Sequence, residues 1–162
     1  MDRRILSLMN LFTAFGRIQN DAWNSLSARD GKVVSSLKSR EIKAMMNIYL
    51  REKTGEAALT LNQLADLLAV KKAAASILIS ALSQKKLITR KVDESNRRYI
   101  RIALTNSGRR LGDAVAGHAA HRMEEIFAEL QNAGATQTEI NSFIATADLI
   151  YQLCMKRPEA QQ

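Results

Sequence analysis

The chain has 162 residues, 46% of them hydrophobic, only 5% aromatic and one of them proline, which favours a single mainly α domain over a β-sandwich or barrel. No apolar run approaches the roughly 18 to 20 residues that cross a bilayer, and the single cysteine excludes an intrachain disulfide and a multi-cysteine zinc site. The net charge is +8, and residues 38–110 hold 16 basic against 6 acidic residues, as a phosphate-binding surface would.

The first two predicted helices follow from apolar spacing. Apolar residues recur at three- and four-residue steps from Ile5 to Leu26, and the polar stretch 27–32 ends this amphipathic helix. Ser39 is the candidate N-cap of a second helix, with Glu41 placed to favour the helix dipole. The second helix closes at 54–56. Its predicted buried residues are Ile42, Met45, Met46 and either Tyr49 or Leu50.

Two short helices joined by a tight turn are predicted next. Thr60 and Gln63 form a capping box that opens the first of them, and the turn lies around residues 69–71. The second covers about residues 72–85. The buried positions of the pair are Leu64, Leu67, Leu68, Ala75, Leu78, Ile79 and Leu82. This arrangement is typical of a helix-turn-helix.

After Leu87 the apolar period changes from 3.6 to 2 residues, which predicts strands at 88–92 and 99–104. The loop between them is 93–96, followed by two arginines. Thr105 is then the N-cap of a long helix that Gly134 ends. A second capping box, Thr136 to Glu139, begins a last helix with a clear apolar stripe.

Three segments in this order resemble the MarR family of bacterial transcription regulators. Leu59–Leu68 (LTLNQLADLL) is similar to the family's LTLSELAERL pattern, and the wing 93–98 (DESNRR) and the junction 104–109 (LTNSGR) match in order and spacing. The resemblance implies a winged helix-turn-helix with a short β-hairpin wing in residues 37–104. It also implies an N-terminal dimerisation helix and linker in 1–36 and C-terminal dimerisation helices in 105–162, the whole forming one compact domain.

The resemblance implies a cytoplasmic homodimer that binds double-stranded DNA, acting as a repressor at a pseudo-palindromic operator. Two recognition helices would then lie about 34 Å apart. The residues expected at the dimer interface are Ile5, Leu8, Phe12, Ile140, Phe143, Ile144, Ala147, Ile150 and Tyr151. Alternatively, the terminal helices only complete the core of their own chain. A small anionic or aromatic effector between the dimer helices and the DNA-binding lobe is a further implication, with no residues assigned to it.

The residues expected at the DNA lie on the second short helix, its preceding turn and the wing. They are Lys71, Lys72, Ala73, Ser76, Ile77, Ser80, Lys91, Arg97, Arg98 and Arg101. The wing arginines suit a minor groove, the lysines and Arg101 suit phosphates, and the serines could reach bases or phosphates. The alternatives are that one wing arginine only pairs with Asp93 or Glu94, and that the others are ordinary surface residues.

The sequence departs from the family at two places. The wing has Asn96 where a second aspartate is usual, which removes one ion pair that would position the arginines. The recognition helix has Ile77 where many relatives carry arginine, and residues 73–75 are alanines without hydrogen-bonding groups. Direct base readout is therefore expected to be poor, and selectivity to come from the wing and from DNA shape.

Three other features admit a functional and a structural interpretation. His118, His121 and Glu125 share one side of a helix and could hold zinc, although such sets are more often surface or interface. Cys154 could sense oxidants, but its place on an apolar stripe favours packing as a small hydrophobe. No phosphate loop, zinc-protease motif or nucleophile motif occurs, so we expect neither an enzyme nor a cofactor.

A rival hypothesis is a winged-helix module that binds another protein through its alanine-rich helix and apolar terminal helices. The scarcity of base-reading side chains supports it. The positive charge of residues 38–110 opposes it.

Overall fold

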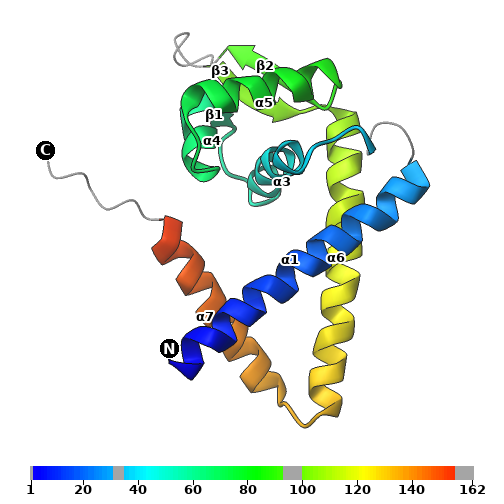
Figure 1. The fold of residues 1–162 in the computed structure, drawn as a ribbon, viewed down its shortest axis with the longest axis vertical. Coiled ribbons are helices and arrows are strands. Elements are labelled where there is room, and N and C mark those ends of the chain that lie inside the picture. The colour runs from blue at the N-terminus through cyan, green and yellow to red at the C-terminus, as the bar shows by residue number, and fades with distance from the viewer. Residues whose placement is uncertain (1, 31–34, 93–99, 156–162) are drawn as a thin grey trace, which may run out of the picture. The chain divides into compact units, whose positions relative to one another are not determined.

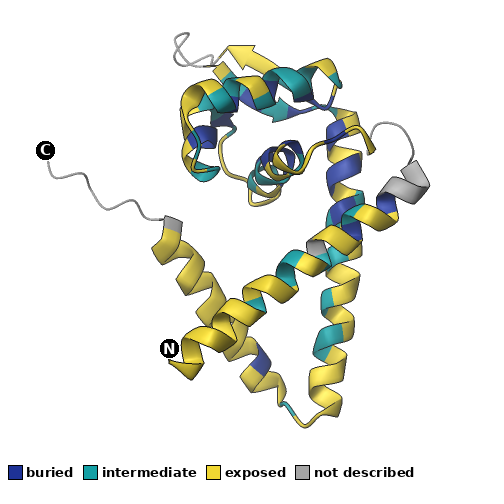
Figure 2. Cartoon of the chain, viewed as in Figure 1, coloured by how far each residue is buried: buried dark blue, intermediate teal, exposed yellow. Residues whose placement is uncertain are grey.

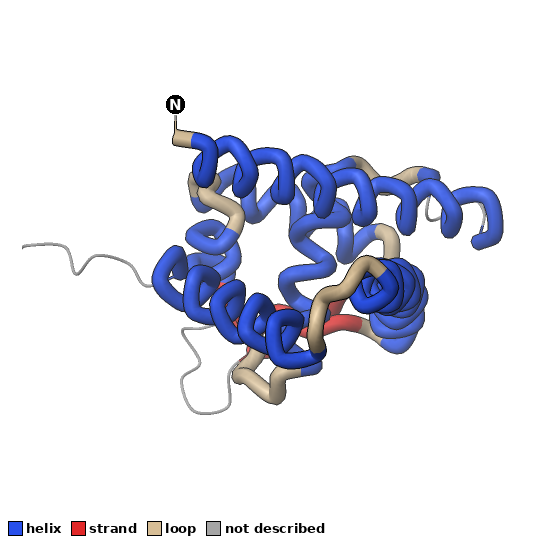
Figure 3. The backbone as a smooth tube through the Cα atoms, turned by 90° about the horizontal axis from the view of Figure 1, so that it is seen from below, coloured by secondary structure: helices blue, strands red, loops and turns tan. Residues whose placement is uncertain are grey.

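The computed structural model describes residues 2–30, 35–92 and 100–155 and consists mainly of helices (Figures 1 and 3). The chain divides into two compact units, residues 1–119 and 120–162. The elements in chain order are α1 (Arg3–Asp30), α3 (Ser39–Lys53), β1 (Leu59–Thr60), α4 (Leu61–Leu67), α5 (Lys72–Gln84), β2 (Ile88–Val92), β3 (Ile100–Leu104), α6 (Asn106–Asn132) and α7 (Gln137–Met155). The predicted mainly α fold with a small β-hairpin wing is thereby confirmed.

The strands form one antiparallel sheet in the order β1-β3-β2. β2 and β3 pair along their whole length, from Ile88 opposite Leu104 to Val92 opposite Ile100. β1 adds Leu59 and Thr60 to the other edge of β3, and this strand was not expected. Its two residues are too few to show an alternating pattern, so only the tertiary pairing reveals it.

Three of the four predicted helix starts, at Thr60, Thr105 and Thr136, are confirmed by their capping hydrogen bonds, and the fourth, at Ser39, is not. The Thr60 side chain accepts a hydrogen bond from the Gln63 backbone at 3.3 Å, and Thr136 does the same for Glu139. Thr105 caps α6 by accepting from the Gly108 backbone at 3.0 Å. The prediction of Ser39 as an N-cap was wrong, because Ser39 is already helical and Lys38 occupies the cap position.

The core of the first unit lies where α3, α4, α5 and the sheet meet (Figure 2). Its largest fully buried side chains are Met45, Ile48, Leu59, Leu64, Leu82 and Ile102. Of the two alternatives in the second half of α3, Tyr49 is buried and Leu50 is exposed. Leu67, Leu68 and Leu78 are only half-buried, which differs from the prediction. Leu68 and Leu78 border a surface hollow described below.

Two glycines allow α6 to approach its neighbours. A Cβ on Gly108 would lie 2.1 Å from the Leu87 carbonyl oxygen, and a Cβ on Gly112 would lie 2.2 Å from the Tyr49 ring. Both separations are far below van der Waals contact, so only glycine permits this packing of α6 against α3 and the segment before β2.

In the second unit, α6 ends at Asn132 and Gly134 adopts a positive φ of 99°, as expected of a residue that ends a helix. α7 then carries a stripe of large apolar side chains. Within the single chain most of this stripe is exposed (Figure 2). Leu130, near the end of α6, is also exposed.

Candidate nucleic-acid interface

Helix α5 separates a buried face from an exposed edge. Ala75, Ile79 and Leu82 are buried, whereas the Ile77 side chain is 70% exposed. The sequence-predicted contact residues occupy the exposed edge to different degrees. Lys72, Ala73 and Ile77 are exposed, and Ser76 and Ser80 are half-buried. This helix follows α4 after a turn in which Ala69 has a positive φ of 51°, so the two helices form the expected helix-turn-helix.

A hydrogen bond joins α5, the predicted recognition helix, to β2, the first strand of the predicted wing hairpin. Arg90 of β2 donates from Nη2 to Ser80 Oγ at 2.8 Å. Arg90 lies on the same face of β2 as the buried Ile88, because side chains two residues apart share a face, and so it reaches across the edge of the core toward α5. Sequence reasoning missed Arg90. The alternation of β2 could have shown that Arg90 and Lys91 point to opposite faces.

The remaining cations of this surface fall into three groups. Lys71, Lys72 and Lys91 are exposed, and among the described residues no carboxylate forms an ion pair with them. Arg101 is half-buried, and its Nη1 donates to the Ala58 carbonyl at 3.0 Å, so part of its guanidinium holds the chain before β1. Arg97 and Arg98 lie outside the described residues, as does Asn96.

A buried ion pair fixes the end of the recognition helix. Glu41 is 5% exposed, and its Oε2 lies 2.6 Å from Lys85 Nζ, while the same ammonium donates to the Ser36 carbonyl at 2.8 Å. The Lys38 backbone donates to Glu41 at 2.9 Å. Burial acts to raise the pKa of Glu41, but these hydrogen bonds and the charges of Lys85 and Lys38 lower it below its usual value. Glu41 is thus held ionised at the junction of α3 and α5.

The junction between β3 and α6 explains the third segment of the resemblance. Glu52 accepts from the Leu104 backbone at 2.8 Å and from Arg109 Nε at 2.8 Å. Together with the Thr105 cap and the close approach of Gly108, these contacts set the direction in which α6 leaves the sheet. These residues therefore position α6 and do not belong to the exposed edge of α5.

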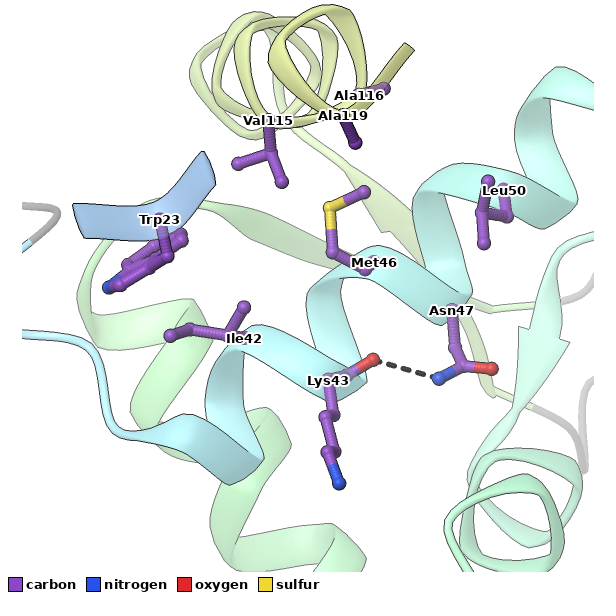
Figure 4. A pocket seen from close by; sticks show the side chains of 9 residues that line it. All are labelled: Trp23, Ile42, Lys43, Met46, Asn47, Leu50, Val115, Ala116 and Ala119. Carbon is purple, nitrogen blue, oxygen red and sulfur yellow. Dashed lines mark hydrogen bonds between the residues drawn. The ribbon is translucent and has the colours of Figure 1, made fainter. Parts of the chain in front are cut away.

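An apolar pocket of about 490 Å³ lies between α1, α3 and the first half of α6 (Figure 4). The residues that line it are Trp23, Ile42, Lys43, Met46, Asn47, Leu50, Val115, Ala116 and Ala119. Lys43 is the one cation among them. Figure 4 shows its side chain directed away from the three α6 residues, and Asn47 Nδ2 donates to the Lys43 carbonyl at 2.9 Å.

The residues expected at the dimer interface are exposed in the single chain, apart from Ile140. Phe12 is 66% exposed in α1 and Tyr151 is 61% exposed in α7. Ile140 is already buried in its own chain. The interpretation of Cys154 as a packed core residue was wrong for the isolated chain, because Cys154 is exposed. A residue on an apolar stripe is buried only where another surface covers it.

The histidines of α6 do not belong to a metal-binding cluster in the described part of the chain. His118 is exposed, and His121 Nε2 lies 3.4 Å from Glu125 Oε1 on the surface of α6. Within residues 2–30, 35–92 and 100–155, no three His, Cys, Asp or Glu side chains gather closely enough to hold a metal ion. None of the described helices combines the length and apolar character needed to cross a membrane.

Comparison with known proteins gives a result for structures only. The sequence matches no protein-family model and no curated protein. The fold is similar to that of MepR, a transcription regulator of a Staphylococcus aureus multidrug efflux pump, solved bound to ethidium bromide. That match has 20% identity, covers 96% of this chain and 98% of the other, and has a TM-score of 0.56.

Two further solved structures extend the likeness. FabT of Streptococcus pneumoniae in complex with DNA is 20% identical over 94% of this chain and 97% of its own, with a TM-score of 0.61. A mutant MarR from E. coli is 14% identical over 93% and 97%, with a TM-score of 0.62. Identities this low are informative about the fold. The chain therefore has the winged helix-turn-helix fold of MarR-type transcription regulators.

Proposed function

We propose that this protein is a DNA-binding transcription regulator that acts as a homodimer on a pseudo-palindromic operator, as a repressor. The observation that carries the proposal is the exposed edge of α5, which presents Lys72, Ala73 and Ile77 directly after the exposed Lys71, and Lys91 of β2 is exposed as well. Cations without carboxylate partners are available to phosphates. The likeness to FabT, solved with DNA, is consistent with this use of the surface.

The side chains on α5 favour affinity over direct base readout. Ala73 and Ile77 can contact a thymine methyl group but cannot hydrogen-bond to a base edge. The hydroxyl of Ser80 is already bonded to Arg90, which leaves Ser76 as the less committed of the two serines. We therefore propose that Arg97 and Arg98 supply most of the selectivity through minor-groove shape.

The proposal is tested by titrating the protein with sheared genomic DNA at several salt concentrations. A DNA binder must lose affinity steeply as salt rises, because each phosphate contact releases a condensed counterion. Replacing both Arg97 and Arg98 with alanine is expected to weaken binding to the operator, isolated as the tightest-binding genomic fragment, about tenfold or more. Arg110→Ala removes an exposed charge of α6 and serves as the control. Unchanged affinity and salt dependence in the double variant would refute the wing mechanism.

The homodimer is supported by the exposed apolar side chains of the terminal helices, among them Ile5, Leu8 and Phe12 in α1 and Phe143 and Ile150 in α7. Large exposed apolar surface on a single chain usually marks an interface. Phe12→Asp is expected to shift the protein from dimer to monomer in analytical ultracentrifugation, with Asp2→Asn as the surface control. A wild-type protein that sediments as a monomer at all accessible concentrations would exclude the dimer.

A small-molecule effector is supported by the apolar pocket between α1, α3 and α6. Its volume suits a compact organic ligand, and Lys43 at its border favours an aromatic compound that is neutral or anionic. The structure of MepR with ethidium bromide is a precedent for an aromatic ligand in a protein of this fold. Binding of an aromatic carboxylate such as salicylate should quench the fluorescence of Trp23, the single tryptophan of the chain, and Ala116→Phe, which fills the pocket without adding a second tryptophan, should abolish the quenching.

A protein-binding module remains the alternative function, favoured by the apolar residues on the exposed edge of α5. The salt titration separates the two hypotheses. A flat or absent response to DNA would favour the module.

A further inference from the structure

A second hollow, of about 190 Å³, lies beside the turn of the helix-turn-helix. It is lined by Arg40 and Lys43 from the first half of α3, by residues 68–70 of the turn, and by Leu78 of α5. Both cations are exposed. Neither was among the residues that the sequence indicated for DNA binding, because the contact between α3 and the turn is a tertiary one.

The position of this hollow follows from the geometry of α5. Successive residues of an α-helix are separated by about 100° around its axis. Relative to the exposed Ile77, Leu78 therefore lies about 100° to one side and Ser80 about 60° to the other. Ser80 is bonded to Arg90 of the wing, and Leu78 lines the hollow with Arg40 and Lys43. The recognition helix thus lies between two basic edges, one belonging to the wing and one to α3.

Among the described residues, the basic residues of α3 form ion pairs in its second half but not in its first half. In the second half, Arg51 pairs with Glu56 at 2.9 Å and Lys53 pairs with Asp113 at 2.8 Å. In the first half, no carboxylate of the described residues pairs with Arg40 or Lys43. Glu41, the nearest acidic residue in sequence, points to Lys85 and is committed there.

Arg40 also occupies a position that stability does not favour. It is the second residue of α3, and positive charge in the first turn of a helix opposes the helix dipole. An unpaired arginine at this position, next to a second unpaired cation and a hollow on the flank of α5, is better explained by an anionic partner than by folding.

We propose that Arg40 and Lys43 bind the phosphate backbone of double-stranded DNA along the side of the major groove opposite the wing. This inference rests on the proposed DNA-binding function and assigns it two further contact residues. A helix placed in the major groove has a sugar-phosphate strand on each side, and phosphate contacts on both sides fix its register without reading sequence. That role suits a recognition helix whose own side chains contribute few hydrogen bonds.

The test measures affinity for a labelled duplex of mixed sequence, about 30 base pairs long to hold two half-sites one turn apart, over a range of salt concentrations. The variants are Arg40→Gln, Lys43→Gln and the double variant, with Arg110→Gln as the matched control and Lys72→Gln as a marker for the α5 edge. Each single variant is expected to lower the slope of log K against log salt by about one per protomer, and the double variant by about two. The loss should be similar for any sequence. Arg40→Lys should retain most of the slope.

The outcomes separate this inference from the function on which it rests. If Lys72→Gln lowers the slope and the α3 variants match the Arg110→Gln control, the protein binds DNA but Arg40 and Lys43 do not contact it. If the wild-type protein shows no salt-dependent binding, both proposals are overturned. Thermal unfolding of each variant, compared with wild type, excludes loss of fold as the cause, because both side chains are exposed and glutamine is a good helix former.

Discussion

Removing Lys85 is expected to destabilise the protein in a way that depends on pH. Lys85→Met keeps the length of the side chain and removes the ammonium that lies 2.6 Å from Glu41 Oε2. The Glu41 carboxylate is buried, and of its two donors among the described residues it then keeps the Lys38 backbone N–H at 2.9 Å. A buried charge without its partner retains the cost of desolvation and loses the attraction that offset it.

The size of the effect can be estimated from similar buried pairs. Breaking a buried ion pair by removing one partner costs about 3 to 5 kcal/mol. The lower end applies here, because the Lys85 side chain is 24% exposed and water can reach the vacated position. For a chain of this size, a loss of about 3 kcal/mol lowers the melting temperature by about 6 to 12 °C. Lys86→Met, at the next position, removes an exposed charge without this pair and is the control.

The sign of the pH dependence follows from Glu41. In the wild type its folded-state pKa is lowered, so its contribution to stability is complete above the unfolded pKa and is lost as pH falls through the folded value. In the Lys85→Met variant the pKa of Glu41 in the folded state is higher than in wild type, because burial still raises it and the Lys85 ammonium no longer lowers it. The two proteins should therefore differ most at neutral pH and converge only as pH falls below the lowered folded-state pKa of wild-type Glu41, where the carboxyl is protonated in both proteins.

The measurement is thermal unfolding at one fixed protein concentration, followed by circular dichroism between neutral and acidic pH. A melting-temperature difference that stays constant across this range would show that Lys85 acts through packing, and the electrostatic reasoning would then be wrong.

Three further changes probe the packing and the helix starts. Gly112→Ala should lower the free energy of unfolding by about 1 to 3 kcal/mol, because the new methyl overlaps the Tyr49 ring, and differential scanning calorimetry would detect it. Thr60→Ala should lower the free energy of unfolding, measured with urea, by about 1 kcal/mol, because the cap to Gln63 is lost. An unchanged free energy would show that this cap does not stabilise the protein. Asp113→Asn should lower the pKa of Tyr49 in an ultraviolet titration. Burial of Tyr49 and its hydrogen bond to Asp113, at 2.8 Å, raise this pKa in the wild type, and an unchanged titration would contradict that assignment.

Local sequence signals predicted most of the fold. The capping boxes at Thr60 and Thr136 and the cap at Thr105 fixed helix starts, because each depends on residues three positions apart. The same reasoning failed at Ser39. There the Glu41 side chain accepts a hydrogen bond from the backbone of Lys38, the residue before Ser39, and a serine side chain is not needed to begin the helix.

The amphipathic stripes of α1 and α7 show what a periodic pattern leaves open. The pattern predicts which side of a helix is apolar, but not whether the covering surface belongs to the same chain or to a second one. Phe12 and Tyr151 are exposed in the single chain, whereas Ile140, on the same predicted stripe as Tyr151, is buried. Burial by a partner depends on association and not on local sequence, so the dimer stays a proposal.

The candidate interface was predicted where it lies on one helix and missed where it depends on tertiary contact. The exposed edge of α5 follows from helical spacing. Arg90 and Arg40 do not, because each gains its place beside α5 from the packing of a different element against that helix. The basic residues that sequence reasoning selected were those next to the motif, and this choice overlooked the first half of α3.

Lys43 borders both the apolar pocket and the hollow that it lines with Arg40. Its side chain points away from the three α6 residues that line the other side of the apolar pocket (Figure 4). If both proposals hold, a ligand with a negative charge and a DNA phosphate compete for the same ammonium. An anionic ligand should then reduce the salt dependence of DNA binding by about one contact per protomer, whereas a neutral aromatic ligand of the same size should not. The charge of the effector, and not only its fit to the pocket, would decide how it acts on DNA binding.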